Sequence, residues 1–303
     1  MKGEPLPIFG LEGKGLCTVF EIGNEKVALV TDSACDLNDA LLAKYDIRFV
    51  SLRMVCSRGE FRDRVEISND ELYALLKTEV PKTSLPLPED VSKLYASLQA
   101  QGCTHVLHLS LSSGLSGTYN LCRMLAEDYE GMKIDVVDTK TLSFGLGLLV
   151  LTAAEMLSEG KPVAEVISAV EKKRETQLGS FVIRTLEFLR KGGRIGLVEG
   201  VVGSILQLKP VIFVNDEGIY QTLTKARGLN NAIDAMCNEH FRRFADKPVR
   251  VGIVHADDPE GAEKLLAKLS TKLNVASSII GPVSPILAVH TGPGLLGAII
   301  QEA

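Results

Sequence analysis

The sequence predicts an α/β protein with two domains: a mostly parallel sheet flanked by helices, followed by a second α/β domain with a mixed sheet. The chain has 303 residues, of which 46% are hydrophobic and 23% charged. This length is enough for two hydrophobic cores, because single domains cluster near roughly 100–200 residues. Short β-branched runs alternate with amphipathic segments over residues 27–177, and hairpin-like runs follow from residue 178 onward.

The predicted N-terminal domain, residues 27–177, begins with VALVT at 27–31, a short β-branched run that ends at Asp-Ser. Asp36 is expected to cap the next helix, with Asp39 three residues further on. The same pattern of a strand followed by a helix recurs at IRFVSL (47–52). It recurs again at HVLHLSL (105–111), followed by a helix through Leu121 and Leu125, and at IDVVD (134–138), followed by a helix that begins near Ser143. Such alternation is typical of a parallel sheet covered on both faces.

The predicted C-terminal domain, residues 178–303, opens with strands that are close enough in sequence to pair as hairpins. The expected strands are FVIRT (181–185), PVIFV (210–214), IYQTLT (219–224), VRVGIVHA (249–256) and ASSII (276–280). No linker rich in Pro, Gly or Ser separates the two domains, so we expect them to pack closely and to form a cleft, a common place for a ligand. Residues 1–26 show no clear period and are interpreted as a leader of unknown role.

Composition excludes several functional classes. The 33 Lys and Arg residues and 38 Asp and Glu residues give a net charge of -5, without a basic run that could follow a nucleic acid backbone. The six cysteines contain no Cys-x-x-Cys pair, so neither a metal site nor a disulfide framework is predicted. The N-terminus does not resemble a secretory signal, and we expect a cytoplasmic protein. The apolar residues 144–157 are shorter than the roughly 20 residues of a membrane span, so we expect a buried helix and no stable membrane insertion.

The segment LSLSSGLSGTYN (109–120) places four serines and a threonine between a strand end and a helix start. Ligands of open α/β sheets lie beyond the carboxyl ends of strands, where a helix N-terminus offers free N–H groups to an anion. Ser113 and Gly114 are expected at that edge. The alternative is that Ser116 caps the helix and the glycines turn the chain.

Two further motifs carry candidate binding residues. Thr83 and Ser84 lie in KTSLPLPED (82–90), where the prolines favour extended backbone and Pro88 can start a helix. An ordinary Ser/Thr turn is the alternative. His290, in ILAVHTGPG (286–294), is expected at the end of an apolar strand, where it is either a binding residue or a satisfied core histidine.

Other motifs are interpreted as structural. LRKGGRIG (189–196) lacks the spacing of a phosphate loop and is expected to be a turn anchored by Arg194. Asp32 and Asp36 could form an acid/base pair, although the predicted capping role explains Asp36. His105 and His108 should point to opposite faces of a strand, which excludes a shared metal. His240 belongs to the apolar stripe of a helix and is expected in the core.

Seven motifs in this order resemble those of the DegV family of bacterial fatty-acid-binding proteins, from residue 27 onward. They are TDSACDL, KTSLP, SSGLSGTYN, DTKTLSFGLG, LRKGGRI, LKPVI and HTGPG. The resemblance implies two α/β domains and one buried long-chain fatty acid, with no other cofactor. It also implies a partner: a separate ATP-dependent fatty acid kinase subunit that phosphorylates the bound carboxylate for phospholipid synthesis.

The resemblance also assigns residues. The carboxylate-binding hydroxyls fall on Thr83 and Ser113, and the positions that line or brace the site fall on Ser84, Gly114, Arg194 and His290. These roles are non-catalytic. The family commonly has a serine after the proline of the first motif, whereas Leu87 follows Pro86 here.

Two other functions stay open at this point. The same loop could bind a small anion such as a phosphate ester in a sensor or binding protein. Ser113 and His290 could also form a serine hydrolase dyad, although the Gly-x-Ser-x-Gly elbow of such enzymes is missing around Ser113.

Overall fold

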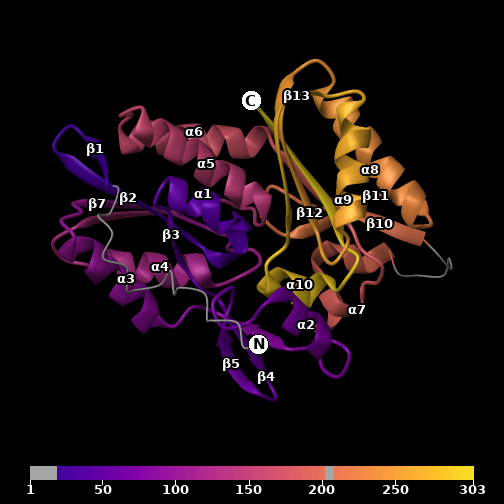
Figure 1. Ribbon diagram of the computed structural model, residues 1–303, viewed down its shortest axis with the longest axis horizontal. Coiled ribbons are helices and arrows are strands. Elements are labelled where there is room, and N and C mark those ends of the chain that lie inside the picture. The colour runs from indigo at the N-terminus through magenta and orange to yellow at the C-terminus, as the bar shows by residue number, and fades with distance from the viewer. Residues whose placement is uncertain (1–18, 202–207) are drawn as a thin grey trace, which may run out of the picture.

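Three β-sheets organise the computed structural model, which describes residues 19–201 and 208–303 (Figure 1). The first sheet contains β1 (Phe20–Ile22), β2 (Glu25–Asp32), β3 (Arg48–Val50), β7 (His105–Ser110) and β8 (Lys133–Asp138). β2, β3, β7 and β8 are parallel, and β1 pairs with β2 in the antiparallel sense. The predicted parallel sheet is therefore confirmed. β1 lies in the segment interpreted as a leader, of which residues 1–18 lie outside the described residues.

Helices cover both faces of this sheet, which explains why its central strands are apolar throughout. The helices are α3 (Pro88–Ala100), α4 (Thr118–Glu127), α5 (Phe144–Ser158) and α6 (Val163–Thr176). Leu29 and Leu107 pack with the side chains of α5, whereas Val30 and Val106 pack with those of α3 and α4. α6 packs on α5 and contacts β14 (Leu296–Glu302) of the second sheet. The helices expected near Leu121 and after Ser143 are confirmed, as is the buried character of residues 144–157.

The second sheet is mixed, as predicted. Its strands are, in spatial order, β11 (Tyr220–Arg227), β10 (Leu208–Val214), β9 (Leu178–Val182), β14 (Leu296–Glu302), β12 (Pro248–His255) and β13 (Asn274–Pro282). β12 and β13 are parallel, and the other neighbours are antiparallel. α8 (Leu229–Phe244) and α9 (Pro259–Ser270) cover the face of this sheet that lies away from the first sheet (Figure 1).

A small antiparallel sheet was not predicted from the sequence. It contains β4 (Arg53–Cys56), β5 (Gly59–Arg62) and β6 (Lys82–Ser84), with β4 in the middle. β6 pairs with β4 so that Thr83 lies opposite Met54, which is fully buried. The extended backbone predicted for Thr83 is thus confirmed, and its position is fixed by a sheet.

α5 joins the two large sheets. It contacts β2 and β7 on one side and β12 and β14 on the other. Its first residue, Phe144, packs against two glycines: a Cβ atom on Gly252 would lie 2.8 Å from Phe144 Cβ, and one on Gly281 would lie 3.1 Å from Phe144 Cζ. The strands of the first sheet lie before residue 139 and those of the second after residue 177. The exact domain boundary stays a prediction.

Short helices complete the chain: η1 (Ser33–Cys35), α1 (Asp39–Lys44), α2 (Asn69–Leu75), α7 (Glu187–Lys191), η2 (Gly196–Val201) and α10 (Pro285–Thr291). The prediction that Asp36 caps the first helix was wrong. Asn38 is the N-cap of α1 and its side chain accepts a hydrogen bond from the Leu41 N–H, whereas Asp36 is buried and bonded elsewhere. Among the described residues, none of the helices is long and apolar enough to cross a membrane.

Candidate functional site

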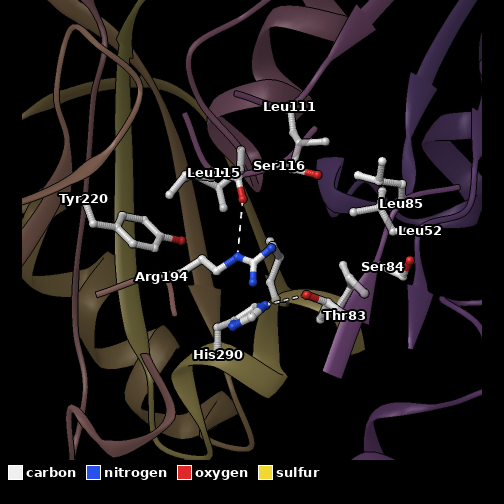
Figure 2. Close-up of a pocket in the computed structure, with 13 residues that line it drawn as sticks. Leu52, Thr83, Ser84, Leu85, Leu111, Leu115, Ser116, Arg194, Tyr220 and His290 are labelled. Atoms are coloured by element: carbon white, nitrogen blue, oxygen red, sulfur yellow. Dashed lines mark hydrogen bonds between the residues drawn. The ribbon is translucent and has the colours of Figure 1, made fainter. Parts of the chain in front are cut away.

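A cavity of about 230 Å³ lies where the small sheet, α10 and the serine-rich loop between β7 and α4 (residues 111–117) meet. Its lining residues are Leu52, Thr83, Ser84, Leu85, Leu111, Leu115, Ser116, Leu142, Arg194, Tyr220, Ile286, Leu287 and His290. Figure 2 shows Arg194, His290 and Thr83 close together, with leucines and the polar side chains of Ser84, Ser116 and Tyr220 around them. Four residues that the sequence selected separately are therefore brought together: Thr83, Ser84, Arg194 and His290.

Thr83 and His290 make direct contact across 207 residues of sequence. The Thr83 Oγ1 atom lies 3.1 Å from His290 Nε2 (Figure 2). The His290 side chain is partly buried, and its Nδ1 atom is buried and has no hydrogen-bond partner among the described residues. An N–H group without a partner costs more than a free acceptor, so we place the ring proton on Nε2, where it donates to Thr83 Oγ1. The Thr83 hydroxyl hydrogen can then point into the cavity.

His290 does not end a strand, as was predicted. It lies in the last turn of α10, a short helix that begins with Pro285 at its first position. The apolar run was misread because six of the seven residues of α10 are buried, so no polar face marks it as a helix. Burial, and secondarily the charge of Arg194, lowers the pKa of His290 to about 3. The imidazole is therefore neutral near pH 7.

Arg194 supplies positive charge to this cavity. It extends from the turn after α7, where Nη1 donates to the Gly192 carbonyl at 2.8 Å and Nε donates to the Leu115 carbonyl at 3.4 Å. No acidic side chain within the described part of the chain forms an ion pair with it. The predicted turn is confirmed for residues 192–195, whereas residues 189–191 end α7 and Gly196 begins η2. A Cβ atom on Gly192 would lie 2.1 Å from His290 Nδ1, so this turn needs glycine to let the imidazole approach.

Ser113 and Gly114, which the resemblance assigns to the site, are not among the residues that line this cavity. The Ser113 hydroxyl accepts a hydrogen bond from Lys140 Nζ at 2.9 Å, and its N–H donates to Asp138 at 3.1 Å. The loop turns through Ser112, whose hydroxyl bonds to the Gly218 carbonyl at 2.7 Å. Ser113 therefore faces the end of β8, on the other side of the loop from Thr83.

Ser116 lines the cavity instead. The alternative weighed from the sequence, that Ser116 caps the next helix, is only partly right. Gly117 is the N-cap of α4 and no side chain caps this helix, while Ser116 Oγ lies 3.3 Å from the Thr118 N and 2.9 Å from the Thr118 hydroxyl. Because Thr118 can donate to Ser116 Oγ, the Ser116 hydroxyl hydrogen can point into the cavity.

A second, apolar cavity of about 50 Å³ shares part of its wall with the first. Both are lined by Leu142, Tyr220 and Leu287. The remaining walls of the second cavity come largely from the two strands at the centre of the second sheet and their neighbours, and include Phe181, Val214, Val254, Leu295 and Ile299. The first cavity therefore has a group of polar side chains, called the polar end below, and it lies beside a second cavity that is mainly apolar.

Other sequence candidates line neither cavity. Asp32 and Asp36 do not form an acid/base pair that faces a cavity, because both are buried and accept hydrogen bonds from the chain. His105 bonds to Asp135 at 2.8 Å and His108 bonds to Tyr95 at 2.8 Å, so they share no ligand. His240 is buried and bonds to Ser180, as a core residue. No cluster of metal-ligating side chains occurs in the described residues.

A family model described as "Uncharacterised protein, DegV family" matches residues 26–303. The chain belongs to the DegV family. A DegV domain-containing protein from Clostridium acetobutylicum is 39% identical over 276 residues, which cover 91% of this chain and 99% of the relative. The resemblance seen in seven ordered motifs is thereby confirmed.

Solved structures of similar proteins share the fold, and three of them are described as binding a fatty acid. A fatty-acid-binding DegV protein from Thermus thermophilus has a TM-score of 0.84 and 32% identity, covering 91% of this chain and 99% of its own. A Thermotoga maritima protein whose structure revealed a fatty acid binding function has a TM-score of 0.82 and 30% identity, covering 92% and 100%. A stearic-acid-binding protein from Eubacterium ventriosum has a TM-score of 0.79 and 29% identity, covering 91% and 98%.

Proposed function

We propose that this DegV chain binds one long-chain fatty acid, with the carboxylate at Thr83, Ser116, Arg194 and His290 and the tail in the apolar cavity. The observation that carries this proposal is the pair of cavities that share part of their wall. The first has a cation that is not paired to a described acidic side chain, and the second is lined mainly by apolar residues. Fatty acid binding by the related structures supports the same ligand class.

The free energy of binding comes mainly from the tail. A chain of about 15 methylenes contributes about 12 kcal/mol when buried, at roughly 0.8 kcal/mol each, before the entropy losses of association. Each hydrogen bond to the charged head group adds roughly 1.5–3 kcal/mol. The tail therefore sets the affinity, and the polar end sets the orientation.

The polar end is suited to a carboxylate because it offers donors. In our assignment Thr83 and Ser116 each present a hydroxyl hydrogen, and the Nη2 atom of Arg194 is not used by the two bonds to carbonyls. His290 is neutral and acts on the ligand through Thr83. Leu87, which replaces a serine common in the family, does not line the cavity, so its effect on the head group is small.

We assign the chain no catalytic step. The hydrolase alternative needs Ser113 beside His290, yet Ser113 bonds to Lys140 and His290 bonds to Thr83. A small anion would occupy only the polar end and would leave the apolar cavity without a role. Both alternatives are therefore weaker than a fatty acid.

Lipid extraction tests the proposed ligand. The purified chain is denatured in organic solvent, the released material is identified by mass spectrometry, and delipidated protein is titrated with stearic acid. We expect the released material to be a fatty acid of roughly C14–C20, the size class with about 15 methylenes. We also expect saturable stearate binding. Release of a phosphate ester, or the absence of both fatty acid and stearate uptake, would overturn the proposal.

We further propose that the bound carboxylate is presented to an ATP-dependent fatty acid kinase subunit, as the family resemblance implies. Stearate-loaded protein is incubated with such a subunit and ATP, and acyl phosphate is trapped with hydroxylamine as the hydroxamate. Hydroxamate formation that needs both proteins is expected. Equal formation with free stearate would show that this chain does not present the substrate.

A further inference from the structure

The segment TDSACD (31–36) holds a set of buried polar side chains that the proposed ligand does not touch. Asp32 and Asp36 lie on either side of η1, and Asp63 lies beside them after β5. All three carboxyl groups are buried. Their hydrogen bonds show what they do in the fold.

Two of these carboxylates hold the start of α10. Asp36 Oδ1 accepts from the Ser284 N–H at 2.8 Å, and Asp63 Oδ1 accepts from the Ile286 N–H at 2.9 Å. Ser284, the N-cap of α10, makes no side-chain cap of its own. The first N–H groups of a helix need acceptors, and here the acceptors come from residues more than 200 positions earlier.

α10 carries three lining residues of the first cavity: Ile286, Leu287 and His290. A displacement of its first turn would move all three, because a helix of two turns shifts as one body. The contact between Thr83 Oγ1 and His290 Nε2 therefore depends on where α10 is held. Asp36 and Asp63 fix that position from the opposite end of the helix.

The same segment also holds the other walls. Asp32 Oδ2 accepts from the Leu111 N–H at 2.7 Å, and Ser33 Oγ accepts from the Leu52 N–H at 3.1 Å. The second oxygen of Asp36 accepts from the Ser143 hydroxyl at 2.5 Å, one residue after Leu142. Each of these bonds reaches a lining residue of the cavity or its neighbour in sequence.

We infer that Asp36 and Asp63 are positioning residues for the candidate site, which hold α10 so that His290 meets Thr83 and the aliphatic side chains of α10 close the cavity. Where ligand affinity is the readout, this inference rests on the proposed function. Burial is the largest effect on the pKa of Asp32, Asp36 and Asp63, and it raises all three by disfavouring the charged form. The positive charge of Arg64 opposes this effect at Asp36 and Asp63. Such groups are costly to keep in a core, which fits a role in geometry.

The test compares Asp36→Ala and Asp63→Ala with Asp36→Asn and Asp63→Asn. Alanine removes the acceptor from a buried N–H, and stearate affinity should fall on the order of ten-fold. Asparagine keeps an oxygen in place, so affinity should return to within about three-fold of the parent. Asp258→Ala is the matched control, because Asp258 caps α9 through the Gly261 N–H at 3.0 Å and touches no lining residue.

A second readout does not depend on the ligand. The ¹⁵N signals of the His290 ring report which nitrogen carries the proton and whether it is hydrogen-bonded. The parent, both Asn variants and Asp258→Ala should show one tautomer protonated at Nε2, and both Ala variants should show a mixture. Unchanged ring signals and stearate affinity in the Ala variants would overturn the inference, as would an equal loss in Asp258→Ala. Ring signals that respond as expected in a protein that binds no stearate would refute the proposed ligand and support the positioning role.

Discussion

Ser116 shows what sequence alone leaves undecided at the scale of a residue. Four serines occur between Leu109 and Thr118, and any of them fits a binding loop at a helix start. The course of the loop decides which hydroxyl lines the same cavity as Thr83, and that course depends on long-range bonds such as the one from Ser112 to Gly218. The motif could be found from the sequence, whereas the choice between Ser113 and Ser116 could not.

Matched serine variants test this choice. Ser116→Ala removes a hydroxyl that lines the cavity, so stearate affinity should fall by roughly 1.5–3 kcal/mol, the value of a hydrogen bond to a charged group. Ser113→Ala removes a hydroxyl that bonds to Lys140, and the affinity should stay within about three-fold of the parent. Isothermal titration with stearate measures both. A larger loss in Ser113→Ala would restore the assignment made from the motif.

Asp63 gives stability a defined pH dependence. Burial raises its pKa to about 7, so the folded state binds a proton more tightly than the unfolded state. Its contribution to the free energy of unfolding is therefore fully present below about pH 4 and is lost as the pH rises toward 7. Asparagine does not titrate in this range, so Asp63→Asn does not lose this contribution. The free energy of unfolding of Asp63→Asn, relative to that of the parent, should therefore be higher at pH 8 than at pH 4.5. Urea unfolding at the two pH values measures the difference, and a difference independent of pH would contradict the raised pKa.

At the scale of elements, the parallel sheet and its helices were predictable because each carries its own periodicity. VALVT, HVLHLSL and IDVVD became β2, β7 and β8. α10 was misread as a strand because it is short and buried nearly all around. The small sheet was missed because β4, β5 and β6 span only three or four residues each, and Thr83 owes its position to that sheet.

Leu87 occupies the N-cap position of α3. Its backbone is extended, with φ -68° and ψ 138°, and its side chain makes no cap bond. Serine at such a position accepts from the first free N–H groups of a helix, so Leu87→Ser should stabilise the protein by about 0.5–2 kcal/mol. Stearate affinity should not change, since Leu87 does not line the cavity. Leu87→Ala is the control without a gain, and a loss of affinity in Leu87→Ser would tie this position to the site.

At the scale of the whole molecule, two domains were predictable, but their shared core was not. One hydrophobic cluster includes Leu29 and Leu107 of the first sheet together with Val254 and Ile299 of the second. The glycines that admit Phe144 are single residues in ordinary strands, and nothing in the sequence marks their partner. The cavities lie within this shared core, so the site depends on both domains.

A shared core has a thermodynamic consequence. Neither large sheet can lose contact with α5 without exposing buried apolar surface, so the two domains should unfold together. Scanning calorimetry of the delipidated chain should show one transition. Two transitions separated in temperature would show that the domains are stable without each other.

The central claim is that the polar end of the cavity holds a fatty acid carboxylate. The crystal structure of the chain with stearic acid tests it most directly. We expect the carboxylate within hydrogen-bond distance of Thr83 and Ser116 and beside Arg194, with the tail running past Tyr220 and Leu287 toward Ile299. A carboxylate at Ser113, a reversed ligand, or an unoccupied cavity beside Thr83 at saturating stearate would contradict it.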